Sequence, residues 1–316
     1  MLNWQPMLAR YLRFMLLLEL AAYAGIAELL HLRFGWSYGP LALLGIGAAL
    51  AWRFAMVCIG ASIGYVARSP RAAEHRIGPL GGLKLLFREW GAVVATSFFR
   101  FPWERRALRR DPEPGPACPI PILLVHGYFA NRGYFAGLVR RLESRGVAPV
   151  FTPNLASSFA TIERYAEELG AEIERIAGAG DAQVVVIAHS MGGLGARAYL
   201  CAHGARRVRK LITIASPHHG TVHARFGAGD NARQMSPGSR FLEELREREG
   251  ANGPGIPVTS IYSPHDNLVA PQETSVLPWA KNIAIPGRGH VDILGSPLLV
   301  DILVAELREC GAMAGP

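Results

Sequence analysis

A serine stands at the end of an unbroken apolar run, where its hydroxyl could act as a nucleophile. Residues 184–193 read Val-Val-Val-Ile-Ala-His-Ser-Met-Gly-Gly, so β-branched residues lead up to Ser190 and two glycines follow it. This pattern predicts a buried parallel strand, a sharp turn and then a helix. Small residues at such a turn hold the serine in a strained conformation with its hydroxyl exposed, as in the G-x-S-x-G nucleophile elbow. Ala188 replaces the first glycine of that motif, and a helix N-cap is the alternative role of Ser190.

A serine nucleophile needs a base that takes its proton and an acid that orients the base. In an open α/β sheet such side chains gather at the carboxyl ends of the strands. Asp266 follows a predicted strand at 258–262, and His290 follows the last predicted strand, at 283–285. The chain order Ser190, Asp266, His290 is the order of one serine-hydrolase fold and differs from the others.

Each of these residues also has a plainer interpretation. Asp266 could close a turn, His290 could be a surface histidine, and Asp292 is a competing acid two residues after the proposed base. Other histidines also lie in candidate loops, but none of them follows the last strand, where the chain order requires the base. These are His126, His189, His218, His219 and His265.

The negative charge that develops on an attacked carbonyl oxygen needs backbone N–H donors. One predicted donor is the amide of Met191, the residue after the nucleophile, and the other is the amide of Tyr128 in the loop after an earlier strand. Gly127 permits a tight turn in that loop, and His126 is interpreted as structural. No cluster has the spacing of zinc ligands and there is no glycine-rich phosphate loop, so we expect no metal and no cofactor.

Strands and helices that alternate from residue 119 onward are expected to position these residues. The alternation implies βαβ units, with a mostly parallel sheet of roughly six strands and helices on both faces. The predicted strands are at 120–125, 148–151, 184–188, 211–215, 258–262 and 283–285. The predicted helices are at 134–144, 161–176, 194–203, 240–248 and 298–309.

The N-terminal third of the 316-residue chain is both basic and apolar. Residues 1–111 hold 14 Lys/Arg and 6 Asp/Glu, whereas residues 112–316 hold 19 of each, so the net charge of +8 belongs to the first part. Basic residues interleaved with long apolar runs indicate a membrane surface rather than nucleic acid. Four widely spaced cysteines without a C-x-x-C pair indicate neither a zinc site nor a dense disulfide framework.

Two predominantly apolar stretches, at 11–30 and 41–66, are long enough to cross a bilayer. Each carries a charge near its middle, Glu19 and Arg53, and an antiparallel hairpin would bring the two together as an ion pair. The basic flanks favour both ends of the hairpin in the cytoplasm. The alternatives are helices buried in a protein core and, less favoured, a cleaved signal peptide.

The segment after the hairpin has two interpretations. Apolar residues recur at helical spacing from Leu83 to Val94 with charged residues among them. This is typical of an amphipathic helix on a membrane surface, and equally of a helix packed against the soluble domain. A Pro-rich run from Asp111 then predicts a stiff, solvated linker. The expected organisation is a membrane anchor at 1–110, a linker at 111–118 and a catalytic domain at 119–316.

Several motifs resemble a known family in their order and spacing. They are Val-His-Gly at 125–127, Ala-His-Ser-Met-Gly-Gly at 188–193, Ser-Pro-His-His-Gly-Thr at 216–221, Asp266, and Gly-His at 289–290. Together they resemble the bacterial triacylglycerol lipase/esterase branch of the α/β-hydrolase superfamily, over roughly residues 119–310. The resemblance implies Ser190 as nucleophile, His290 as base and Asp266 as orienting acid. It also implies Tyr128 and Met191 as oxyanion donors, and small bacterial lipases of the Bacillus type likewise carry alanine at the elbow's first position.

The sequence thus predicts an α/β-hydrolase fold preceded by a transmembrane hairpin, acting as a serine hydrolase on carboxylic esters, with lipid acyl esters as the expected substrate. The expected partners are the lipid bilayer and the ester substrate, without nucleic acid or a protein partner. The expected location is a bacterial inner membrane with the catalytic domain on the cytoplasmic side. The alternatives are an acyltransferase or thioesterase on the same fold, and a non-catalytic membrane scaffold. The triad alone does not separate hydrolysis from acyl transfer, because both pass through an acyl-enzyme.

Overall fold

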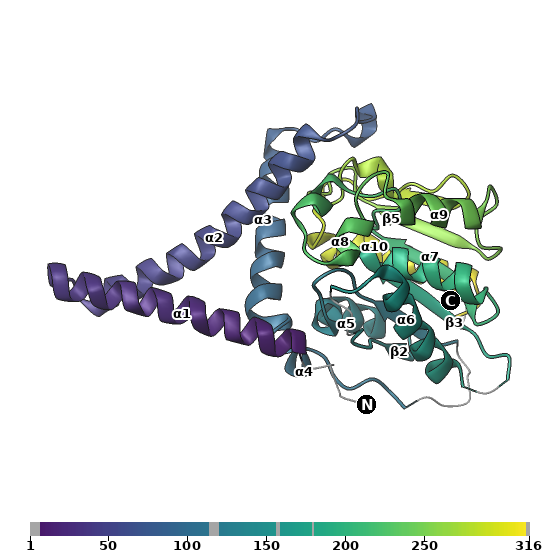
Figure 1. The fold of residues 1–316 in the computed structure, drawn as a ribbon, viewed down its shortest axis with the longest axis horizontal. Helices are drawn as coiled ribbons and strands as arrows, with labels where there is room; N and C mark the ends of the chain where they lie inside the picture. Colours follow the sequence, from purple (N-terminus) through teal and green to yellow (C-terminus); the bar gives the residue numbers. More distant parts are fainter. Residues whose placement is uncertain (1–6, 114–119, 156–158, 179, 314–316) are drawn as a thin grey trace.

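The computed structural model describes residues 7–113, 120–155, 159–178 and 180–313, and Figure 1 shows its fold. Six parallel strands form one sheet in the order β2-β1-β3-β4-β5-β6. The strands are β1 (Ile122–Val125), β2 (Val150–Phe151), β3 (Val184–His189), β4 (Val208–Ile214), β5 (Val258–Tyr262) and β6 (Lys281–Ala284). The predicted α/β fold with a parallel sheet is therefore confirmed.

Helices cover both faces of this sheet. The main ones are α5 (Ala136–Ser144), α6 (Ile162–Ala177), α7 (Met191–His203), α9 (Arg240–Glu249) and α10 (Pro297–Glu309). Successive side chains of a strand point to opposite faces. In β1, Ile122 and Leu124 accordingly join a core with α5 and α10, whereas Leu123 and Val125 join a second core with α6, α7 and α9.

Two predicted helix starts differ from the structure. α7 begins at Met191 rather than at residue 194, so its first turn includes Gly192 and Gly193. The helix predicted at 134–144 opens as a 3-10 turn, η3 (Arg132–Phe135), before α5. The remaining short helices of this part are η4 (Val222–Phe226), α8 (Asp230–Gln234), η5 (Gln272–Ser275) and η6 (Asp292–Gly295).

Three helices precede the sheet: α1 (Met7–Phe34), α2 (Tyr38–Val66) and α3 (Pro79–Ala95). By length and composition, α1 and α2 are each apolar enough to cross a membrane, although a signal sequence near the N-terminus passes the same test. Of their most apolar windows, 0% and 11% are buried inside the protein, so neither is a core helix. Both project away from the sheet and fit a transmembrane hairpin (Figure 1). Shorter helical turns are η1 (Ala73–His75), between α2 and α3, and η2 (Thr96–Arg100) and α4 (Glu104–Ala107), after α3.

The predicted ion pair between Glu19 and Arg53 is confirmed. Arg53 donates through Nη1 to Glu19 Oε1 and through Nη2 to Glu19 Oε2, the latter at 2.6 Å. The hydroxyl of Tyr23 donates to the same carboxylate at 3.0 Å, and the Arg53 guanidinium lies 4.3 Å from the ring centroid of Phe98. The two charges near the middle of the hairpin, Glu19 and Arg53, therefore compensate each other, as an apolar environment requires.

α3 lies between the hairpin and the sheet domain. Trp90 Nε1 donates to the carbonyl of Leu50 in α2 at 3.0 Å. Glu89 is fully buried and accepts from the amide of Asp292, beyond β6, at 2.8 Å. Leu83 and Phe87 remain exposed. Packing against the soluble domain, one of the two interpretations of this helix, describes the face that carries Glu89, while Leu83 and Phe87 on other faces stay about half exposed.

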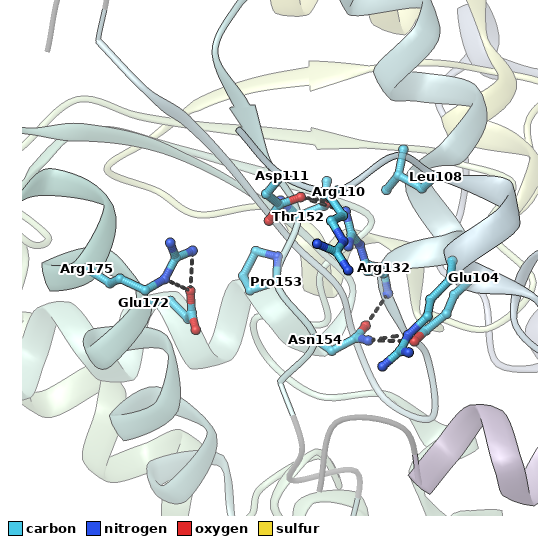
Figure 2. Close-up of a pocket in the computed structure, with 11 residues that line it drawn as sticks. Glu104, Leu108, Arg110, Asp111, Arg132, Thr152, Pro153, Asn154, Glu172 and Arg175 are labelled. Atoms are coloured by element: carbon cyan, nitrogen blue, oxygen red, sulfur yellow. Dashed lines mark hydrogen bonds and ion pairs between the residues drawn. The ribbon is translucent and has the colours of Figure 1, made fainter. Parts of the chain in front are cut away.

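Asp111, the first residue of the predicted linker, and the chain just before it are fixed to the domain (Figure 2). Asp111 accepts from Arg132 Nη2 at 2.6 Å and from the amide of Thr152 at 2.9 Å, and Asn154 Nδ2 donates to both oxygens of Glu104 at 3.0 Å. These residues line a polar cavity of about 660 Å³. Asp111 is thus bound rather than solvated, because its two oxygens meet donors from separate segments. Residues 114–118 of the predicted linker lie outside the described residues.

Candidate active site

Ser190 occupies the sharp turn between the buried strand β3 and α7. Its φ of 57° and ψ of −132° lie where a non-glycine residue is strained. Its side chain makes no capping hydrogen bond to α7, which argues against the N-cap interpretation. Ala188 lies within β3 and does not have a positive φ, so alanine fits where the elbow motif has glycine.

The structure brings the three predicted residues of the triad together. Ser190 Oγ lies 3.1 Å from His290 Nε2, and His290 Nδ1 lies 2.9 Å from Asp266 Oδ2. The other carboxylate oxygen of Asp266 accepts from the amides of Leu268 at 2.7 Å and Val269 at 2.8 Å. Because Nδ1–H donates to Asp266, Nε2 carries the lone pair and accepts the serine proton, which is the tautomer a general base needs.

The electrostatic surroundings of His290 favour its protonated form. Burial lowers the pKa of His290, but the charge of Asp266, the hydrogen bond to Asp266 and the charge of Glu89 together raise the pKa above its ordinary value of 6.5. An imidazolium at this position is therefore stabilised, as it must be while it holds the proton of a serine nucleophile.

Asn267 and His189 hold the backbone of His290 in place. The amide of His290 donates to Asn267 Oδ1 at 2.9 Å, and its carbonyl oxygen lies 3.0 Å from His189 Nε2. Burial keeps the pKa of His189 well below its ordinary value, so this ring is neutral and donates from Nε2. The sequence gives no signal for these two contacts. Both join segments that are distant along the chain, and both depend on the direction of a side chain.

The competing candidates take other roles. Asp292 pairs with Arg288 at 2.9 Å rather than with the ring of His290. Burial lowers the pKa of His126 to about 4, and its Nε2 accepts from the amide of Leu155 at 3.0 Å, so His126 is structural as predicted. His218, His219 and His265 bond to Thr213, the carbonyl of Val276 and the amide of Gly287.

The loop after β1 lies directly against the Ser190 turn. A Cβ atom on Gly127 would lie 2.8 Å from Ser190 Cβ and 3.1 Å from the nitrogen of Met191, so this approach requires glycine. The contact brings the segment with Tyr128 beside the amide of Met191. Because Met191 is the first residue of α7, its N–H has no partner inside the helix. Both predicted oxyanion donors therefore come from segments that meet at Ser190.

Exposed apolar side chains stand around this edge of the sheet. Phe159, Phe226 and Leu268 are 46%, 75% and 38% exposed. The ring centroid of Phe159 lies 5.6 Å from that of Phe129, in the loop after β1, and Leu268 donates its amide to Asp266. Phe159 and Leu268 thus place apolar side chains near the loops of this edge, whereas the lining of the cavity in Figure 2 contains none of the triad residues.

A carboxylate from the N-terminal third also reaches this site. Glu89 of α3 accepts from the amide of Val291, next to His290, at 3.0 Å, and burial raises the pKa of Glu89 to about 7. The sequence pattern alone does not mark Glu89 as part of the site. The available signal was its place four residues after Leu85, which puts both on the same face of the helix.

Among the described residues, no group of three or more His, Cys, Asp or Glu side chains is arranged to hold a metal ion.

Comparison with known proteins gives one family and several similar structures. A family model described as alpha/beta hydrolase fold matches residues 120–296. Lipase B of Aspergillus fumigatus superposes with a TM-score of 0.53 and 22% identity, over 62% of this chain and 53% of that one. Lipase BlEst2 of Bacillus licheniformis, in its mature form, superposes with a TM-score of 0.53 and 18% identity, over 62% of this chain and 96% of that one. The match thus spans about half the length of the Aspergillus lipase. No curated protein sequence matches the chain.

Proposed function

Because the chain belongs to the alpha/beta hydrolase fold family, we propose that it is a membrane-anchored serine hydrolase that cleaves carboxylic esters of lipids. One observation carries this proposal. Ser190, His290 and Asp266 form a continuous series of hydrogen bonds at the carboxyl edge of a parallel sheet, with the serine in a strained turn. The lipases among the similar structures have the same fold and are consistent with ester hydrolysis.

In the first half of the proposed reaction, Ser190 Oγ attacks the carbonyl carbon of the ester while its proton passes to His290 Nε2. Asp266 stabilises the resulting imidazolium through Nδ1–H. The amides of Tyr128 and Met191 donate to the negatively charged oxygen of the tetrahedral intermediate. The C–O bond to the alcohol then breaks, His290 gives its proton to the departing oxygen, and an acyl-enzyme remains.

In the second half, a water molecule replaces the alcohol. His290 takes a proton from the water, whose oxygen attacks the acyl carbon and forms a second tetrahedral intermediate. The bond to Ser190 Oγ breaks, the serine recovers its proton from His290, and the fatty acid leaves. The cycle balances with the ester and water alone.

Two features support a lipid substrate. The apolar helices α1 and α2 fit a transmembrane hairpin, and attachment to a bilayer raises the effective concentration of esters within it. The exposed side chains of Phe159 and Leu268, which lie on or against the loops of the site, offer apolar contacts for an acyl chain. The basic residues that flank the hairpin, Arg10 and Arg13 on one side and Arg68, Arg71 and Arg76 on the other, support a membrane location with the catalytic domain on the cytoplasmic side.

Hydrolysis of p-nitrophenyl esters with acyl chains from short to long tests this proposal on the full chain. We expect hydrolysis of the long-chain esters, and we expect Ser190→Ala to lower kcat/KM by about 10⁴-fold or more. The matched control is Ser144→Ala, which removes an exposed hydroxyl of α5 that bonds only to its own helix, and which should leave kcat/KM unchanged.

The same variants serve in a labelling experiment with a fluorophosphonate probe. Wild type and Ser144→Ala should be labelled, whereas Ser190→Ala should not. Absence of labelling in the wild type would favour the non-catalytic scaffold, and hydrolysis of short chains alone would contradict the lipid substrate. Products formed when alcohols or thiols compete with water distinguish hydrolysis from acyl transfer.

A further inference from the structure

The N-terminal helices contact the two loops that carry the acid and the base of the proposed triad. An anchor that only attaches an enzyme to a membrane does not need to touch its catalytic loops. Here one buried carboxylate of α3 meets the loop of His290, and the backbone of α2 meets the loop of Asp266.

Glu89 accepts hydrogen bonds from the backbone just after His290 and lies directly against Gly289 just before it. The amide of Val291 donates to both carboxylate oxygens, at 3.0 and 3.1 Å, and the amide of Asp292 donates to Oε2 at 2.8 Å. On the other side of His290, a Cβ atom on Gly289 would lie 2.3 Å from Glu89 Oε2, so glycine is needed for the carboxylate to fit. The position of this one side chain therefore constrains the loop from which the imidazole extends.

Burial makes the charged form of Glu89 costly, although the amides of Val291 and Asp292 offset part of this cost. Burial raises the pKa of Glu89 from 4.5 to about 7. Between these values the folded chain binds the proton more tightly than the unfolded chain, so this group's contribution to stability falls as the pH rises through that window. The charged form nevertheless acts on the active site, because it contributes to raising the pKa of His290.

The backbone of α2 lies against the loop of Asp266. A Cβ atom on Gly60 would lie 3.2 Å from the carbonyl oxygen of Asn267, and one on Gly64 would lie 3.4 Å from that of Asp266. Gln272 Nε2 donates to the carbonyl of Asp266 at 2.8 Å and to that of Gly64 at 3.4 Å. Asn267 in turn accepts from the amide of His290, so α2 supports a residue that links the acid loop to the base loop.

On these contacts, and resting on the proposed function, we propose that α2 and α3 are positioning elements of the active site. Glu89 orients His290, and residues 60–64 of α2 hold the loop that carries Asp266 and Asn267. The N-terminal helices thus have a role in the reaction in addition to membrane attachment.

Glu89→Gln in the full chain tests the α3 contact, since glutamine keeps the shape and one acceptor oxygen but removes the charge. We expect kcat to fall about tenfold with KM changed less than about twofold. The carboxylates that face His290 are Asp266 and Glu89, whereas the nearby His189 and His223 are held neutral by burial. The acidic limb of the kcat/KM profile should therefore move to lower pH.

A stability measurement on Glu89→Gln and a control variant distinguish a positioning role of Glu89 from a purely structural one. Above pH 7 the thermal unfolding midpoint of Glu89→Gln should not fall below that of the wild type, because the buried charge is gone. The matched control is Arg88→Gln, which removes an exposed charge from the neighbouring residue of α3 and should change neither kcat nor the pH profile.

Gly60→Leu tests the α2 contact and does not depend on the folding of the Glu89 variant. A leucine there must displace the loop that carries Asn267, so we expect kcat to fall at least about tenfold. The matched control is Gly47→Leu in the same helix, where no atom lies within 4 Å of the added Cβ. It adds the same apolar volume and should retain wild-type kcat.

The outcomes distinguish this inference from the proposed function. Wild-type hydrolysis that depends on Ser190, together with unchanged kcat and pH profile in Glu89→Gln and unchanged kcat in Gly60→Leu, overturns the inference and leaves the function standing. Equal losses of kcat in Gly60→Leu and Gly47→Leu also overturn the α2 role. A wild type without Ser190-dependent hydrolysis overturns the proposed function, and the inference with it.

Discussion

At the scale of single residues, the proposed mechanism depends on which atoms of Asp266 face His290. One carboxylate oxygen accepts from the imidazole and the other accepts from two backbone amides, so the side chain has no freedom to turn. Asp266→Asn would present an amide to Nδ1 and favour the wrong tautomer. We predict a loss in kcat on the order of 10³- to 10⁴-fold with p-nitrophenyl esters.

The control for this prediction lies nearby. Asp292→Asn makes the same chemical change two residues after His290, where the carboxylate pairs with Arg288 instead. The kcat of Asp292→Asn should stay within about threefold of the wild-type kcat, as expected for the loss of one partly exposed ion pair. Comparable losses in the two variants would contradict the assignment of Asp266 as the orienting acid.

A second prediction at this scale concerns pH. His290 must be neutral to accept the serine proton, and its pKa is raised above 6.5 by the nearby carboxylates. The fraction of neutral imidazole therefore grows as the pH rises, and kcat/KM should rise with it to a plateau, with a midpoint above pH 6.5. A profile measured from pH 5 to 9 checks this, and a midpoint below pH 6 would be inconsistent with the arrangement of charges described here.

At the scale of elements, the hairpin of α1 and α2 depends on the pair of Glu19 and Arg53. Glu19→Leu leaves the guanidinium without its carboxylate inside an apolar hairpin, which we expect to destabilise the protein by about 3–5 kcal/mol. The double variant Glu19→Leu/Arg53→Leu removes both charges and should recover most of that loss. Thermal unfolding of the full chain in detergent measures both effects, and a double variant as unstable as the single one would show that the ion pair is not the cause.

Among the elements, the sheet could be predicted from the sequence, whereas the contact of α3 with the catalytic loops could not. The sheet was predictable because unbroken apolar runs such as 184–188 are typical of buried parallel strands, and the order of Ser190, Asp266 and His290 followed from the ends of those strands. The role of Glu89 was not predictable. Helical periodicity shows that one face of α3 is buried, but it cannot show that the partner is a loop about 200 residues later.

At the scale of the whole molecule, the N-terminal helices and the sheet domain are separate in sequence but contact each other in space. The connected ends of α1 and α2 project away from the sheet domain, and the apolar lengths of both helices are left uncovered (Figure 1). If these lengths lie in a bilayer, the protein should hydrolyse esters of its own vesicle in preference to those of another.

Vesicles that carry the protein, mixed with vesicles that carry a fluorogenic lipid ester, test this prediction. The initial rate should be at least about tenfold higher when protein and ester share a vesicle than when they do not, at equal total ester. Equal rates in the two mixtures would indicate that the helices do not place the site at the membrane.

The contacts of Asp111 with Arg132 and Thr152 have a kinetic consequence. They fasten the chain to the domain where a free tether would otherwise begin, so the triad cannot swing out to sample the surrounding solution. Under the proposed function, an ester reaches Ser190 by lateral diffusion in the plane of the lipid. Turnover should follow the mole fraction of ester in that plane, and inert lipid added at constant bulk ester should slow the reaction by surface dilution.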